Sequence, residues 1–268
     1  MATLPAWPRC LICYQGSTMT ESSTSEIDNF NVAVRQLEVM LFIARDTDLQ
    51  RNALKEIEEL SNSVKTLKKE AVIDGSERLS NVFLGCESVL RFLHSELKMW
   101  VLLKEQKPEE AWNSLIDAQS AAMDAIRADE GFSHLTGHLD RLEEIERLVF
   151  PPQVFLSAGL IVGCRECSVC GCEYDDCPHL IGRPYRGEFC HCILKDVEVD
   201  HVSLVPQPAN KRCRVTHFSA EGGKRNRMTW KIESESIEGV QSAEKSGPSV
   251  SGSILDNRDL VVPRQREN

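Results

Sequence analysis

Cysteine and histidine residues are concentrated in one short segment of this chain. Residues 164–192 contain seven of the eleven cysteines and two of the seven histidines. Four of these residues follow the pattern Cys-x2-Cys-x6-Cys-x-His and offer three thiolates and one imidazole: Cys167, Cys170, Cys177 and His179. Tetrahedral Zn²⁺ prefers such ligands, and so short a segment needs a metal to hold one conformation. The spacing therefore predicts a structural zinc site.

The same segment holds further thiols that are candidate ligands. Substitutes for the first four residues, or members of a second site, are Cys164, Cys172, Cys190 and Cys192. A redox-active or merely buried set of thiols is the alternative interpretation. A catalytic zinc ion keeps an open coordination position and usually has histidine and carboxylate ligands, so four closed ligands favour a structural role.

Upstream of this segment, residues 25–150 are predicted to form an antiparallel bundle of about five helices. Apolar residues recur at helical spacing from Ser25 to Leu148, with a stop at Gly75, a first-turn proline at Pro108 and a second stop at Gly131. Short connections between helices favour antiparallel neighbours. We expect the bundle to provide a surface for a protein partner or for self-association.

After Pro152 the sequence changes from helical periodicity to short β-branched runs. Together the two regions predict an α+β fold class. Short β-branched runs in 153–218 predict a small zinc-stabilised β module around the cysteine segment. Residues 1–24 are expected to form a disordered leader, and 219–268 a mostly disordered, flexible tail.

The net charge and its distribution along the chain indicate which kinds of partner the protein could bind. The formal net charge of −10 over 268 residues argues against a general nucleic-acid binder. The charge is uneven, however, because residues 211–231 contain seven Lys and Arg against one Glu, which is a net charge of +6. This stretch is either a solvated basic linker or a contact for phosphate or an acidic partner, so nucleic acid remains an alternative partner.

The sequence also predicts a compartment. No apolar run approaches the ~18 residues of a membrane span, so we expect no membrane association. The first residues lack a basic region followed by an apolar one, which argues against a secretory signal. We therefore expect a cytoplasmic protein, whose clustered thiols stay reduced and bind metal.

Two strings around the cysteine segment resemble the prohead (head-maturation) proteases of phages. Leu156–Gly159 is similar to the Ser-x-Gly nucleophile strand of that family, and His201–Val205 followed by Pro208–Asn210 is similar to its later strand. The resemblance covers about 60 residues, and it does not extend to the helical region. It implies Ser157 as the nucleophile, His201 as the orienting residue and the zinc knuckle as an insertion between them.

The sequence departs from that family where the general base should be. The family's base is a histidine on an upstream strand, whereas here the upstream region is helical and His134 and His138 are the nearest candidates. Without a base the serine is a poor nucleophile. We therefore expect a protease-like scaffold without activity, in a zinc-binding interaction protein of phage or mobile-element ancestry; a working serine peptidase is the alternative.

A second enzymatic alternative rests on Arg127 and His134. Their spacing at the end of one predicted helix and the start of the next is similar to the Arg-x4-6-His signature of HEPN ribonucleases. In that family the two residues act on an RNA phosphodiester bond. A surface arginine and a capping or packed histidine would give the same spacing, and the acidic surface does not favour an RNA-cleaving cleft.

Overall fold

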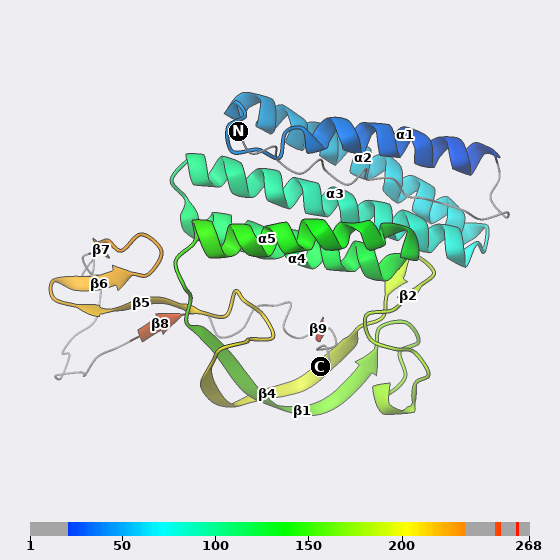
Figure 1. Cartoon of the computed structure of the whole chain (residues 1–268). Helices are drawn as coiled ribbons and strands as arrows, with labels where there is room; N and C mark the ends of the chain where they lie inside the picture. Colours follow the sequence, from blue (N-terminus) through cyan, green and yellow to red (C-terminus); the bar gives the residue numbers. More distant parts are fainter. Residues whose placement is uncertain (1–20, 234–249, 253–260, 263–268) are drawn as a thin grey trace. The chain divides into compact units, whose positions relative to one another are not determined.

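The computed structural model describes residues 21–233, 250–252 and 261–262 of the chain. It shows five α-helices followed by small antiparallel sheets, which confirms the predicted α+β class (Figure 1). The predicted leader before residue 21 lies outside the described residues. The described chain forms two compact units, one of which comprises the helices to Glu146 together with Gly182–Cys190, and the other Arg147–Ile181 together with the residues from His191 onward.

The first unit is the helical bundle. Its elements are α1 (Glu21–Glu38), α2 (Thr47–Ile73), α3 (Glu77–Lys104), α4 (Pro108–Ala128), the 3₁₀ turn η1 (Glu130–Leu135) and α5 (Thr136–Val149). Helix α3 is central: Phe92, Leu93 and Leu97 are fully buried, and it packs against both α2 and α4. Apolar side chains at helical spacing thus form the core that their periodicity predicts.

The start and the end of the first helix differ from expectation. Helix α1 begins at Glu21, four residues before Ser25, and ends at Glu38, although the apolar stripe continues to the buried Leu41. The next helix begins after Asp46, whose carboxylate accepts hydrogen bonds from the backbone N–H groups of Asp48 and Leu49 and so caps helix α2. Local capping decides the boundary, whereas the apolar pattern alone does not.

The second unit is built on a long two-stranded ribbon. Strand β1 (Phe155–Cys167) pairs antiparallel with β4 (Cys192–Val205), and the short β9 (Val261–Val262) continues this sheet next to β4. The ladder shifts register between Gly159 and Leu160, which marks a β-bulge, and β4 continues past this point as one strand. The ribbon carries the 3₁₀ turn η2 (Tyr174–Asp176) in the connection that follows β1.

Two differences from the predicted organisation concern which segments belong to the β module. The hairpin of β2 (Pro184–Tyr185) and β3 (Glu188–Phe189) belongs to the helical unit, where the Gly187 N–H donates to the Asn81 side chain at 2.8 Å. A sheet of order β7-β6-β5-β8 reaches into the predicted tail. Its strands are β5 (Val215–Ala220), β6 (Gly223–Asn226), β7 (Ile232–Glu233) and β8 (Val250–Gly252).

Candidate metal centre

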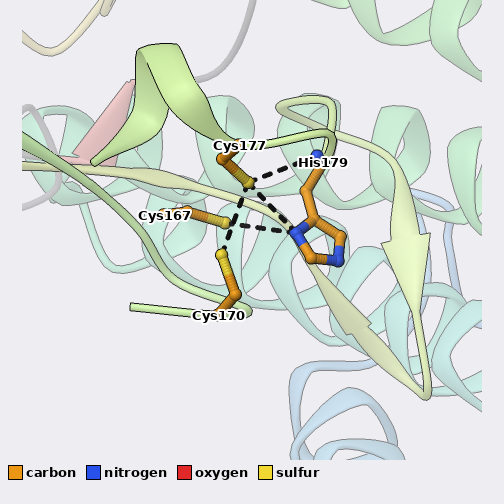
Figure 2. Close-up of side chains that lie close together, drawn as sticks. All are labelled: Cys167, Cys170, Cys177 and His179. Carbon is orange, nitrogen blue, oxygen red and sulfur yellow. Dashed lines mark hydrogen bonds between the residues drawn. The ribbon is translucent and has the colours of Figure 1, made fainter. Parts of the chain in front are cut away.

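The four residues predicted as zinc ligands converge in the second unit. The sulfur atoms of Cys167, Cys170 and Cys177 and the ring nitrogen of His179 all lie within 4.8 Å of one another (Figure 2). Cys167 ends strand β1, Cys170 lies in the turn after it, and Cys177 and His179 follow the 3₁₀ turn η2. A strand end, a tight turn and a short helical turn therefore bring together residues that are close in sequence.

The separations between the four ligand atoms match a tetrahedral metal. Cys170 Sγ lies 3.4 Å from Cys177 Sγ, which lies 3.1 Å from His179 Nδ1. Cys167 Sγ lies 3.7 Å from the same nitrogen. A zinc ion with bonds of about 2.3 Å to sulfur and about 2.0 Å to nitrogen separates neighbouring ligand atoms by roughly 3.6–3.8 Å. These three separations lie near that range and the whole group lies within 4.8 Å, so an ion at the centre would require only local adjustment of the ligand side chains.

Backbone geometry fixes the turn that carries the first two cysteines. The Gly171 N–H donates to the Cys167 carbonyl at 2.9 Å, and the Cys167 N–H donates to the Cys172 carbonyl at the same distance. Gly171 has φ 70°, a left-handed conformation that glycine adopts without a Cβ clash. The Val169 N–H points at Cys167 Sγ from 3.4 Å, so the turn already places a donor on the first ligand.

The second pair of ligands is fixed in a similar way. The Cys177 N–H closes the η2 turn onto the Tyr174 carbonyl, and the His179 N–H donates to Cys177 Sγ at 3.3 Å. The hydroxyl of Tyr174 accepts a hydrogen bond from the Ile181 N–H at 3.3 Å. Arg165, on strand β1, forms an ion pair with Asp175 in the turn. These contacts attach the loop to the strand beside it.

Hydrogen bonds onto sulfur favour the thiolate at the first ligand. Burial raises the pKa of the Cys167 thiol, but the backbone N–H groups of Cys170 and Val169 and the side chains of Cys177 and Cys170 together lower that pKa to about 6. Burial raises the pKa of the Cys177 thiol to about 11. A cation would stabilise both as thiolates, because a metal-bound thiol loses its proton.

The remaining candidate cysteines do not belong to this group. Cys192 is buried directly opposite Cys167 in the ladder, and Cys164 lies opposite Lys195. Cys172 is exposed, and Cys190 is buried at the end of the hairpin in the helical unit. All nine cysteines in the described part of the chain are free thiols.

The two residues implied by the protease resemblance lie on the β1–β4 ribbon. Ser157 pairs with Ser203 and Gly159 pairs with His201, so Ser157 and His201 occupy diagonal positions on one face. His201 Nδ1 lies 2.9 Å from a carboxylate oxygen of Asp200, and both side chains are more than half exposed. The pattern of the sequence did not indicate Asp200.

The two residues of the ribonuclease alternative each contact a neighbour in the helical unit. Arg127 forms an ion pair with Asp124 one turn earlier at 3.7 Å. His134 lies in η1, where its Nδ1 is 3.1 Å from the Gly131 carbonyl and burial lowers the pKa of its imidazole. His138, the other nearby histidine, is buried in α5. The nuclease interpretation stays a prediction.

Comparisons of the chain with protein families, with curated proteins and with solved structures found no match. Among the described residues, no helix is both long enough and apolar enough to span a bilayer.

Proposed function

We propose that Cys167, Cys170, Cys177 and His179 bind one structural Zn²⁺ ion and that the second unit is a non-catalytic binding module. The observation that carries this proposal is the convergence of four soft ligand atoms within 4.8 Å. Three thiolates and an imidazole are the donors that Zn²⁺ takes in closed tetrahedral sites. Four protein ligands leave no coordination position for a substrate or a reactive water.

The burial pattern supports a loop that is stabilised by a metal. No side chain between residues 168 and 180 is buried, so this loop contributes nothing to an apolar core. Hydrogen bonds and exposed ion pairs alone stabilise a loop weakly. A zinc ion would join the end of β1 to both sides of the η2 turn, and its binding free energy becomes folding free energy of the loop.

The wider role we propose is that of a cytoplasmic interaction protein. The free thiols in the described residues are consistent with a reducing compartment. The helical unit exposes apolar side chains on α1 and in the connection that follows it, including Val32, Val39 and Ile43. Exposed apolar groups that lie close together are typical of surfaces that bind a protein partner or a second copy.

Metal content of the purified chain tests the site. The wild type, purified without added metal or chelator, should carry one zinc ion per chain in native mass spectrometry. Cys177→Ser should lose the zinc, and limited proteolysis should then cleave within 164–181. Cys172→Ser is the matched control, because it removes an exposed thiol of the same loop that lies outside the four converging residues.

Two results would refute the structural zinc site. A wild-type chain without bound metal, still protected from protease in this loop, would show that the loop needs no ion. Equal loss of zinc in the Cys172→Ser control would show that the ligand set is different. Retention of zinc by Cys177→Ser would have the same meaning.

The Asp200–His201 hydrogen bond favours a second candidate function, a serine hydrolase at Ser157. With Nδ1 turned to Asp200, the Nε2 atom of His201 is the ring nitrogen that remains to act as a base, on the ribbon face that also carries Ser157. A fluorophosphonate probe should then label the wild type but not Ser157→Ala, with Ser203→Ala as the control on the opposite strand. Absence of labelling in the wild type excludes this candidate and leaves the metal site unaffected.

A further inference from the structure

Trp230 is an exposed tryptophan in the second unit. It is 61% exposed and lies in the connection between strands β6 and β7, whereas Trp100 and Trp112 are buried in the helical unit. A large aromatic side chain is costly to expose to water. Its exposure therefore calls for an explanation.

The indole ring lies over one face of the β5–β6 pair. Phe218 and Arg225 are directly opposite each other in the ladder and so share that face. The ring of Phe218 meets the Trp230 ring edge to face at 5.7 Å, and the Arg225 guanidinium lies 5.7 Å from the indole centroid. Both contacts come from the sheet, and Trp230 nevertheless remains 61% exposed to solvent.

The backbone holds Trp230 in this position. Its N–H donates to the Asn226 carbonyl at 2.9 Å, and its own carbonyl accepts a hydrogen bond from the Arg225 side chain at 3.0 Å. The buried Asn226 side chain accepts from the N–H groups of Met228 and Thr229, which orders the loop in between. Trp230 has φ 62°, an unfavourable conformation for a bulky residue. The fold thus tolerates strain to present this side chain.

The electrostatic surroundings are basic in an otherwise acidic chain. Residues 211–231 carry a net charge of +6, whereas the whole chain carries −10. Lys231 follows Trp230 and is exposed, and Lys224 precedes Arg225 on β6. An accessible aromatic ring bordered by cations is the combination that binds bases by stacking and the phosphates between them by charge.

We propose that Trp230, supported by Phe218 and Arg225, is a stacking platform for single-stranded nucleic acid. An unpaired base stacks on the exposed indole, and Arg225 and Lys231 contact the adjacent phosphates. A paired base in a duplex has both faces occupied and is not available to the platform. An acidic peptide would use the cations without needing the indole face. This inference is independent of the proposed zinc site.

Fluorescence anisotropy with a labelled oligothymidylate of about 15 nucleotides tests the platform. The full-length wild type should bind at low salt and bind an equivalent duplex more weakly. Trp230→Ala should weaken binding at least about fivefold, and Trp230→Phe should weaken it less. Lys231→Gln should reduce the salt dependence by about 0.7 in the log–log slope. Lys69→Gln is the control, because it removes an exposed cation from helix α2.

Three outcomes would overturn the proposal. The first is no binding of the oligothymidylate by the wild type at low salt. The second is equal affinity of the wild type and Trp230→Ala, which would mean that charge alone binds the strand. The third is tighter binding of a polyglutamate peptide than of the oligonucleotide, which would assign the surface to an acidic protein partner. The fold of each variant is checked by circular dichroism, and zinc content is measured in parallel.

Discussion

The ring of Phe132 lies directly against the backbone of Gly85. A Cβ atom built on Gly85 would come within 2.1 Å of the Phe132 ring, which is fully buried. Gly85 lies inside helix α3, and Phe132 lies in the turn η1 that joins α4 to α5. This glycine therefore permits the close approach of the η1 turn to the central helix.

Alanine at this position should destabilise the helical unit. Phe132 has no room to move in the core, so we expect Gly85→Ala to lower the free energy of unfolding by about 1–3 kcal/mol. Gly137→Ala is the matched control, because Gly137 is exposed in helix α5 with no atom near its missing Cβ. Removing glycine from a helix there should raise stability by about 0.5 kcal/mol. Urea denaturation followed at a helical signal measures both, and similar values for the two variants would contradict the packing explanation.

A buried ion pair between Glu96 and Arg141 should contribute to the stability of the bundle. The Glu96 side chain is completely buried, forms an ion pair with Arg141 and accepts a hydrogen bond from the Trp100 indole N–H at 3.3 Å. Burial raises the pKa of the Glu96 carboxyl, although Arg141 acts against this. Arg141→Met leaves that carboxylate without its cation and should cost about 3–5 kcal/mol at neutral pH.

Two further measurements distinguish the loss of the positive charge of Arg141 from the loss of its packing. The Arg141→Met defect should shrink at acidic pH, since protonation of Glu96 removes the isolated buried charge. Adding Glu96→Gln to Arg141→Met should restore part of the lost stability at neutral pH. If the double variant is as unstable as the sum of both single variants, lost packing explains the effect instead.

His138 should make the stability of the helical unit depend on pH. Burial, followed by the charges of Arg141 and His134, lowers the pKa of its imidazole to about 4. The unfolded chain binds this proton more readily than the folded chain, so stability should fall as pH decreases from about 6.5 towards 4. The full loss from this one group is about 3 kcal/mol.

The comparison variant for this pH effect is His138→Phe. The imidazole meets the Phe92 ring edge to face at 5.6 Å, so a phenyl ring keeps the aromatic contact and removes the titration. Stability curves of the two proteins should diverge below about pH 6.5. The raised pKa of Glu96 acts in the opposite direction in both proteins, so the difference between them isolates His138. Parallel curves would contradict the prediction.

Asn226 should control the order of the loop that carries Trp230. Its side-chain oxygen accepts from Met228 and Thr229, and its amide nitrogen lies 3.3 Å from His217 Nε2. Asn226→Ala leaves two partly buried backbone donors without this acceptor and should cost about 1 kcal/mol. Asn226→Asp keeps the acceptor and should cost less. Amide exchange at Met228 and Thr229 measures this, and equal exchange in both variants would refute the role of the oxygen.

The sequence was most informative where contacts are local. Cys167, Cys170, Cys177 and His179 span thirteen positions, and their spacing and residue types were enough to predict which side chains converge. The helices were predictable for the same reason, because apolar periodicity reports directly on the buried face. The end of α1 was not, since the stripe continues past Glu38 and only the cap at Asp46 shows where the next helix begins.

Contacts between distant or polar segments were not predictable. Strand β6 has the sequence Gly-Lys-Arg-Asn, which offers no apolar alternation and resembles a solvated tail. Its strand structure comes from pairing with β5 and β7. A polar run of four residues does not indicate which segments will pair with it. The charge of 211–231 does not indicate the role of Trp230, although a single tryptophan among these cations is visible in the sequence.

The hairpin Gly182–Cys190 determines how the protein can be divided into fragments. It belongs to the helical unit but interrupts the other one between His179 and Cys192, so no single cut yields two intact halves. Its ends are adjacent, because the Gly182 N–H donates to the Cys190 carbonyl at 2.8 Å. A linker of about three glycines can therefore replace it without moving the flanking chain. A fragment of residues 147–268 shortened in this way would retain all four candidate ligands, whereas a helical fragment ending at residue 146 would lose the segment that bonds to Asn81.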